Sequence, residues 1–399
     1  MIRHSVDSLA IFGGGPEYGE PLHVGRPNIG DKQAILSRLA DILDRRWLTN
    51  NGPCLRELEE KIAARAGVRH CVCMCNGTVA LEVLVKALGL TGEVIVPSFT
   101  FVATAHCVSW LGLKPVFADV NPSTHSLDVK HVESLINRHT SAILGVHLWG
   151  VPCAVGALGD LAKRHALRLI YDAAHAFGCS SGGTPIGGFG DAEVFSFHAT
   201  KFFNTFEGGA IVTNDEALAE RCRKLRNFGF QGFDDVVEIG TNGKMPEVCA
   251  AMGLESLLGL DGVVRHNREN WRTYSRLLGE LPGLSVLRYD ENEACNYQYV
   301  VVTVDAARTG LTRDELVQVL HAENVLARRY FTPGTHRMRA YAEAYADVRL
   351  PVTEQLAECV LCLPTGTAVD PNDVAKICNV MRLALSDPER VRAALRQLR

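Results

Sequence analysis

The residue best placed to do chemistry is a lone lysine, Lys201, in a bend between two apolar runs. The segment from Glu193 to Gly209 reads EVFSFHATKFFNTFEGG, and a second apolar run, Ala210–Thr213, follows. Aromatic neighbours exclude water and disfavour the charged ammonium, so they lower the pKa of a lysine. A free amine is a nucleophile that forms a Schiff base with a carbonyl compound. The alternative is an ordinary surface lysine in a hairpin loop, because lysines are mostly exposed.

A second candidate is a carboxylate, Asp172, at the end of the apolar run Arg168–Tyr171. A carboxylate there can keep a heterocyclic nitrogen protonated. Pyridoxal 5′-phosphate (PLP) requires this, because its protonated ring withdraws electrons from a substrate carbanion. Asp172 can equally cap the next turn. His175, three residues on, can be a structural histidine held by hydrogen bonds.

Three other short patterns fit the binding of a flat, phosphorylated cofactor. Asn76-Gly77-Thr78 precedes an amphipathic segment, and a helix N-terminus with a glycine and a hydroxyl residue binds phosphate well. Thr78 can instead be a plain helix cap. Ser196, close before Lys201, can donate to a phosphate. An aromatic of Pro97–Phe101 can stack on a ring, or it can belong to the core.

The elements that must position these residues alternate between strands and helices. Strands are expected at about 93–96, 115–120, 142–148 and 168–171, and helices at about 31–45, 53–66, 78–88, 100–110, 127–138, 157–165, 216–227 and 246–278. Such alternation with nearly continuous apolar strands predicts an α/β fold, with a mostly parallel sheet covered by helices on both faces. Open parallel sheets bind ligands beyond the carboxyl ends of their strands, where these motifs fall.

The last part of the chain has a different pattern. It predicts a strand near 297–304, a helix at 313–323 and a C-terminal helix from about 371, which suggests a smaller α+β domain. We therefore expect an N-terminal arm at 1–30, a large domain at 31–262 and a small C-terminal domain at 263–399.

Composition excludes several classes of protein. The chain has 399 residues, 47% of them hydrophobic and 22% charged, with a formal net charge of −4. These values describe a globular protein and argue against non-specific binding of nucleic acid. No apolar run reaches the roughly 18 residues of a membrane span, and the N-terminus lacks a secretory signal, so we expect a cytoplasmic protein. Cys71, Cys73 and Cys75 alternate along one strand face, which favours a buried strand over a zinc site, and no metal is expected.

Taken in chain order, the motifs resemble those of the PLP-dependent nucleotide-sugar aminotransferases (DegT-type, aspartate aminotransferase fold type I). The resemblance runs from Val24 to the region of Pro364 and implies a mostly parallel mixed sheet plus a smaller α+β domain. It implies PLP as cofactor, and a Schiff base on Lys201 as catalytic lysine. Asp172 would pair the ring nitrogen as the second catalytic residue. The remaining cofactor contacts implied are Gly77, Thr78, Phe101, His175 and Ser196.

The resemblance also implies a homodimer with shared active sites. Gly240–Met245 is similar to a family loop that reaches the neighbouring subunit's cofactor through Asn242. Lys244 replaces the usual arginine there and loses its bidentate fork, so no carboxylate clamp is expected from it. Tyr330–His336 resembles a loop near the nucleotide sugar, which makes Tyr330 and His336 candidate substrate contacts.

The implied activity is amino transfer from a donor, glutamate, to a keto group on a nucleotide-activated deoxysugar. The motif Ser-Phe-His before Ala-Thr-Lys looks more like members that aminate C4 of a dTDP-4-keto-6-deoxyhexose than like those that aminate C3. Two alternatives stay open. Sugar dehydratases on this fold carry histidine where Lys201 stands, and a non-catalytic PLP-binding regulator would share the fold without turnover.

Overall fold

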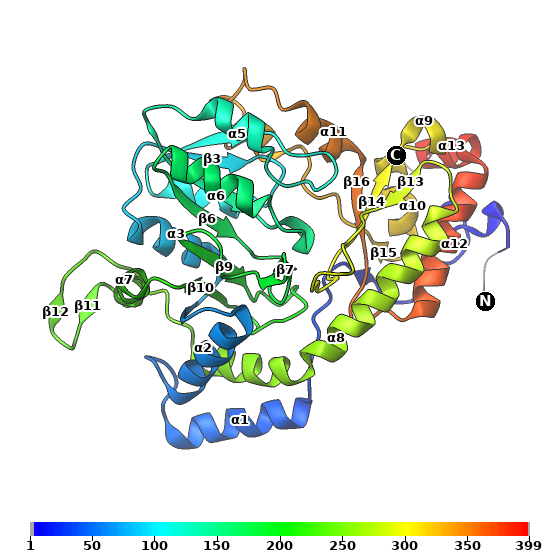
Figure 1. The fold of residues 1–399 in the computed structure, drawn as a ribbon. Helices are drawn as coiled ribbons and strands as arrows, with labels where there is room; N and C mark the ends of the chain where they lie inside the picture. Colours follow the sequence, from blue (N-terminus) through cyan, green and yellow to red (C-terminus); the bar gives the residue numbers. More distant parts are fainter. Residues whose placement is uncertain (1–3, 398–399) are drawn as a thin grey trace.

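The computed structural model describes residues 4–397. Its centre is a seven-stranded sheet in the order β2-β10-β9-β6-β5-β3-β4 (Figure 1). β10 is antiparallel to both neighbours and the other strand pairs are parallel, so the predicted mostly parallel, mixed α/β sheet is confirmed. The strands are β2 (His70–Met74), β3 (Glu93–Pro97), β4 (Lys114–Ala118), β5 (Thr140–Val146), β6 (Arg168–Asp172), β9 (Ala192–Ser196) and β10 (Gly209–Thr213).

Helices cover both faces of this sheet, as the sequence predicts. One face packs on α3 (Gly77–Ala87), α4 (Ala103–Trp110) and α7 (Glu216–Arg226). The other packs on α5 (Val129–Leu135) and α6 (Val155–Arg164), and on α2 (Pro53–Ala66) with the start of α8 (Glu247–Gly279). α1 (Lys32–Arg45) lies outside α8. The strands are almost wholly buried, which explains why they read as continuous apolar runs rather than alternating ones.

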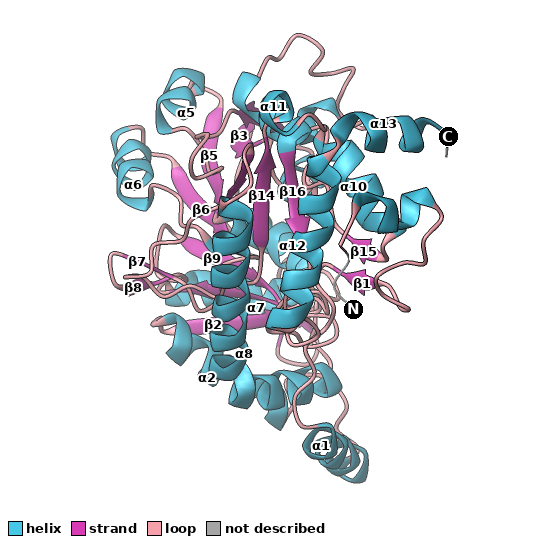
Figure 2. Cartoon of the chain, turned by 90° about the vertical axis from the view of Figure 1, so that its right-hand side faces the viewer, coloured by secondary structure: helices cyan, strands magenta, loops and turns pink. Residues whose placement is uncertain are grey.

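A smaller α+β unit follows, built on the three-stranded antiparallel sheet β13-β14-β16. The long helix α8 (Glu247–Gly279) runs from the large sheet into this unit and passes through the expected boundary at 262/263. Figure 2 shows α8 beside α12. The unit comprises β13 (Leu284–Val286), β14 (Val300–Val304), α9 (Ala306–Thr309), α10 (Arg313–Ala322), β15 (Val325–Leu326), α11 (Pro351–Cys359), β16 (Val360–Leu363), α12 (Pro371–Ser386) and α13 (Pro388–Gln397).

The N-terminal arm is irregular, apart from short 3-10 turns and the two-residue strand β1 (Leu22–His23). β1 pairs in parallel with β15, so the arm lies on the small unit. Among the described residues, no helix is both long and apolar enough to cross a membrane.

Three predicted helices differ from the observed ones. α4 begins at Ala103 rather than near Thr100, because Ser98 bonds through its backbone to both Ala118 and Thr335 and keeps residues 98–100 out of the helix. α5 spans Val129–Leu135 rather than about 127–138, because Asp128 caps its start and Ile136 is extended. The single predicted C-terminal helix is two helices, α12 and α13, separated at Asp387. Pro388 disfavours helical geometry in the residue before it, and it begins the next helix well.

Candidate active site

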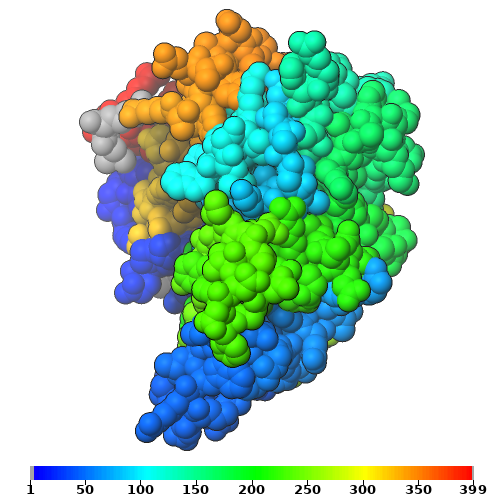
Figure 3. Space-filling view, turned by 90° about the vertical axis from the view of Figure 1, so that its left-hand side faces the viewer, coloured from blue at the N-terminus to red at the C-terminus, as the bar shows by residue number. Residues whose placement is uncertain are grey.

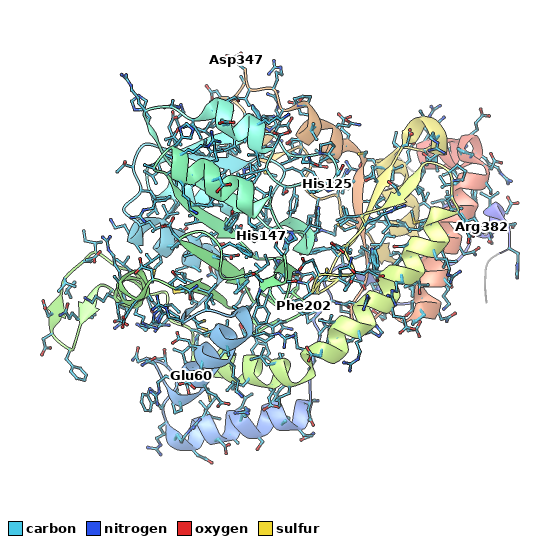
Figure 4. The ribbon with its side chains drawn as sticks, viewed as in Figure 1. Glu60, His125, His147, Phe202, Asp347 and Arg382 are labelled. Atoms are coloured by element: carbon cyan, nitrogen blue, oxygen red, sulfur yellow. The ribbon has the colours of Figure 1, made fainter. Side chains whose placement is uncertain are left out.

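The sheet brings the predicted site residues to one edge. β2, β3, β6 and β9 run parallel to one another, so their carboxyl ends lie at the same edge of the sheet. The segments that follow these ends carry the motifs predicted from the sequence. Figure 4 labels Phe202, the neighbour of Lys201, where this edge approaches the small unit.

Lys201 lies in the loop between β9 and β10, half-buried beside the fully packed rings of Phe202 and Phe203. Its Nζ is 3.3 Å from the hydroxyl oxygen of Tyr299. Burial lowers the pKa of Lys201 to about 8, although the charge of Asp172 partly opposes this shift. The aromatic bend therefore lowers the pKa of the amine as predicted, and about a tenth of it is free at pH 7.

Asp172 is the last residue of β6 and is buried. Its Oδ2 accepts a hydrogen bond of 2.8 Å from the Thr104 hydroxyl, and its Oδ1 accepts one of 3.1 Å from the Ala174 N–H. Burial raises the pKa of Asp172, while these two donors and Lys201 lower it. Asp172 thus caps the following turn, as one reading of the sequence expected, and also presents a buried carboxylate towards Lys201.

His175 is buried in the turn after Asp172. Its Nδ1 accepts the backbone N–H of Trp149 at 3.2 Å, and its Nε2 lies 3.1 Å from the Tyr299 hydroxyl. Burial, reinforced by the charge of Lys201, holds the pKa of His175 well below its ordinary value. The imidazole is therefore neutral and held at both nitrogens.

The start of α3 forms a narrow cradle against β9 and β10. A Cβ added to Gly77 would lie 3.1 Å from the Ser196 Cβ, and one added to Gly209 would lie 2.6 Å from the Gly77 nitrogen. The helix cap is Asn76, whose Oδ1 accepts the Val79 N–H at 2.8 Å, so the alternative of a cap by Thr78 is wrong. Asn76 fits because its side chain reaches the third N–H of the helix. The positive end of the helix and the Ser196 hydroxyl can bind an anion here.

The other predicted residues lie in different surroundings. The Phe101 ring is 57% exposed, whereas Phe99 is in the core. Asn242 is exposed on the loop after the β11–β12 hairpin (Phe230–Gln231 and Asp235–Val236). Tyr330 packs edge-on against Tyr299 at 6.1 Å. His336 is fully buried and tied at both ring nitrogens, to Ser98 at 2.6 Å and Glu354 at 3.2 Å, which suits a structural role.

Two polar contacts of the site were not predicted. Thr104 comes from α4 and Tyr299 from the residues before β14, and both reach the site only through the tertiary fold. A threonine in a helix and a tyrosine at a strand start carry no local signal. Cys71 and Cys73 lie as predicted on one buried face of β2, with sulfurs 3.9 Å apart, whereas Cys75 lies just beyond the end of the strand and is half-buried.

Comparison with known proteins agrees with this geometry. The dTDP-4-amino-4,6-dideoxy-D-glucose transaminase of Shigella dysenteriae is 38% identical over 363 residues, covering 91% of this chain and 99% of that protein. A UDP-4-amino-4-deoxy-L-arabinose–oxoglutarate aminotransferase of Shewanella sediminis (strain HAW-EB3) is 33% identical, covering 95% and 98%. The crystal structure of DesI in the presence of its TDP-sugar product superposes with a TM-score of 0.94 and 48% identity, covering 98% of this chain and 100% of DesI.

The match to the family itself extends over nearly the whole chain, from residue 30 to residue 382. It includes the cradle at Gly77, the carboxylate Asp172 and the lysine loop. The chain therefore belongs to the DegT/DnrJ/EryC1/StrS aminotransferase family.

Proposed function

We propose that this enzyme transfers an amino group from glutamate to the C4 keto group of a dTDP-4-keto-6-deoxyhexose, with PLP as cofactor. The observation that carries the proposal is the buried carboxylate of Asp172 facing an amine, Lys201, whose pKa is lowered to about 8. An amine that is partly free near neutral pH can act both as a nucleophile and as a proton carrier.

The residues present fit PLP. The cradle of Gly77 and Ser196 at the start of α3 is narrow, lies at a helix N-terminus and suits a phosphate. Asp172 is a buried anion, already held by two hydrogen-bond donors, that suits a protonated ring nitrogen. When bound, PLP supplies the electron sink that stabilises a substrate carbanion.

Each of these residues then has a definite task. Lys201 would attach the cofactor covalently, and when its Nζ is free it can accept and return a proton. Asp172 would keep the ring nitrogen protonated, and His175 would hold the ring hydroxyl. Phe101, two residues before α4, would stack on the ring. The buried rings around Lys201 exclude water, which strengthens these electrostatic contacts.

Names of the relatives support the substrate. The Shigella relative is named for a 4-amino-4,6-dideoxy sugar linked to dTDP, and DesI was crystallised with a TDP-sugar product. The Shewanella relative is named as an oxoglutarate aminotransferase, and oxoglutarate is what remains when glutamate gives up its amino group. The histidine of the Ser-Phe-His motif, His198, resembles that of C4-aminating members. We propose that Tyr330, whose ring packs edge-on against Tyr299, contacts the sugar nucleotide.

The proposal includes a homodimer whose two sites are shared. Phe233 is 96% exposed and Ile239 is 85% exposed, on or beside the β11–β12 hairpin. Figure 1 shows this hairpin projecting from the side of the large sheet, and Figure 3 shows the same segment on the face turned to the viewer. Exposed apolar side chains grouped in this way mark an interaction surface. Asn242 follows directly in the chain, so a partner covering the hairpin would bring its own active site near Asn242.

The test uses the purified chain with PLP, glutamate labelled with nitrogen-15 and dTDP-4-keto-6-deoxyglucose. Mass spectrometry is expected to show the label in an amino-sugar nucleotide, with formation of oxoglutarate. The matched control substrate is the 3-keto isomer, which should give little product. Loss of water from the sugar without label would indicate a dehydratase. Bound PLP without any turnover on a panel of keto-sugar nucleotides would indicate a regulator.

A further inference from the structure

Tyr299 reaches the site from the small unit, on a segment that hydrogen bonds hold against the active-site loops. The Asn296 Nδ2 donates to the His175 carbonyl at 2.8 Å, and the Gln298 Nε2 donates to the same carbonyl at 2.7 Å. The Gln298 Oε1 accepts the N–H of Phe202, next to Lys201, at 3.4 Å. The small unit thus forms hydrogen bonds, next to Tyr299, with both the loop of His175 and the loop of Lys201.

The Tyr299 side chain has little freedom. It is 7% exposed, and its ring packs edge-on against Trp149 at 5.2 Å and against Tyr330 at 6.1 Å. Its hydroxyl has two polar neighbours among residues 4–397, the Nζ of Lys201 at 3.3 Å and the Nε2 of His175 at 3.1 Å. The hydroxyl therefore links the lysine to the histidine.

Counting hydrogens gives this link a direction. The Trp149 N–H donates to Nδ1 of His175, so Nδ1 carries no hydrogen and a neutral imidazole must carry it on Nε2. That hydrogen points at the Tyr299 oxygen, and the tyrosine's own hydrogen is left for the lone pair of a free Lys201 amine. An ammonium has no lone pair to receive it. Burial keeps the pKa of His175 well below and that of Tyr299 well above the ordinary values, so both stay neutral.

The backbone that starts this chain of hydrogen bonds is itself unusual. Trp149 has a φ of 63°, a left-handed conformation that is strained for a bulky residue and is found mostly at functional sites. The fully buried indole stacks on His175 at 5.7 Å. The strained residue aims its N–H at the ring nitrogen that fixes the tautomer.

We propose that Tyr299 is a positioning residue for the amino transfer: its hydroxyl accepts a hydrogen from His175 and donates its own to the free amine of Lys201. This inference rests on the proposed function, because Tyr299 can position Lys201 for amino transfer only if the chain catalyses amino transfer. The titratable groups that face Lys201 from other elements are Asp172 at the end of β6, His175 in the turn after it and Tyr299 itself. Asp172 favours the ammonium, and the tyrosine hydroxyl favours the free amine.

The experiment measures the pKa of Lys201 in the full-length, cofactor-free chain. The rate of its arylation by 1-fluoro-2,4-dinitrobenzene is followed against pH, with the Lys201 peptide quantified by mass spectrometry. Tyr299→Phe removes the donor to the free amine, so the pKa should rise and reactivity near pH 7 should fall by about threefold or more. Turnover is not measured, so a failure of the proposed sugar substrate would not affect the result.

The matched control is Tyr289→Phe. The Tyr289 hydroxyl lies 2.9 Å from the backbone carbonyl of Tyr299 and 3.2 Å from that of Trp149, so it supports the same segments without touching Lys201. It should leave the pKa of Lys201 where it is. An unchanged or lowered pKa in Tyr299→Phe, or an equal rise in the control, would overturn the proposal.

A second measurement needs no change at Tyr299. Nitrogen-15 NMR of histidine-labelled wild-type protein, with the signal of His175 assigned from a His175→Gln variant, reports the tautomer directly. We expect the hydrogen on Nε2. A hydrogen on Nδ1 would reverse the direction of the link and overturn the proposal, even if Tyr299→Phe did not fold.

Discussion

Two opposing effects set the state of Lys201. Its aromatic surroundings destabilise the ammonium, and the carboxylate of Asp172 stabilises it. Burial has the larger effect, and the pKa falls to about 8. A more exposed loop would leave the lysine charged, and a closer carboxylate would do the same. The reactivity of the Lys201 amine therefore depends on its burial and on an Asp172 carboxylate that is near but not in contact with it.

The lowered pKa of Lys201 predicts a cost in stability. Below about pH 8 the folded state holds a disfavoured charge that the unfolded chain holds freely, so Lys201→Met should stabilise the cofactor-free protein by about 1–3 kcal/mol. Between about pH 8 and pH 10.4 the unfolded chain binds more protons than the folded one. The free energy of unfolding of the wild type therefore increases with pH in this range, and the stabilisation by Lys201→Met decreases. Urea unfolding at about pH 7 and pH 9.5 measures this, with exposed Lys86→Met as control. A destabilised Lys201→Met protein would contradict the assignment of burial as the cause.

Asp172 should be indispensable for turnover but not for folding. Asp172→Asn keeps the shape and an acceptor for Thr104, but it removes the charge that holds a ring nitrogen protonated. We expect turnover to fall by about 10²–10⁴-fold, the range for losing a group that sets a proton transfer. Thr104→Val, which removes one hydrogen bond to the carboxylate, should cost only about tenfold. Steady-state rates with glutamate check both, and near-normal turnover of Asp172→Asn would exclude it as the partner of the ring.

At the scale of elements, the start of α3 contains one residue that stabilises the helix, Asn76, and one that is proposed to bind the cofactor, Thr78. Asn76 is the residue that caps the helix, so Asn76→Ala should lower the free energy of unfolding by about 1 kcal/mol, whereas Asn76→Ser should retain most of it. Thr78 makes no capping hydrogen bond, so Thr78→Ala should leave the stability of the cofactor-free chain nearly unchanged. Thermal unfolding of the three variants checks this. An equal loss in Thr78→Ala would show that the threonine supports the helix after all.

The elements of the large sheet were predictable because each carries a strong local pattern. Long amphipathic helices such as α1, α2 and α8 agree with the prediction to within a residue or two. The residues near Thr100 were not predictable, because their non-helical backbone depends on hydrogen bonds to β4 and to Thr335, far away in the chain. Local preference there is overridden by the tertiary fold.

The same reason limits prediction of the site. Asp172 and Lys201 stand beside strand ends, and the rule for parallel sheets places such residues together. Tyr299 is separated from Lys201 by 98 positions and is delivered by the small unit, so no spacing in the sequence connects them. What the sequence cannot supply is the set of contacts made where two folding units meet.

At the scale of the whole molecule, the apolar surface of the β11–β12 hairpin has no covering among residues 4–397. Phe233, Val236 and Ile239 are all more than half exposed. Surfaces of this kind are unusual on monomers and typical of interfaces between subunits. A second copy of the chain in a twofold arrangement would cover both hairpins equally, because the same patch meets itself or its symmetric counterpart.

A mixing experiment tests whether this interface shares the active sites. Suppose each site takes Lys201 from one chain and Asn242 from the other. A heterodimer of Lys201→Ala and Asn242→Ala chains then has one intact site and one site with both lesions. Equal mixing makes about half the dimers heterodimers, so activity should recover to about a quarter of wild type. If both residues came from one chain, every heterodimer site would carry a lesion and mixing would restore nothing. Subunit exchange is established beforehand with differently tagged chains, and each single variant is first shown to be clearly defective on its own.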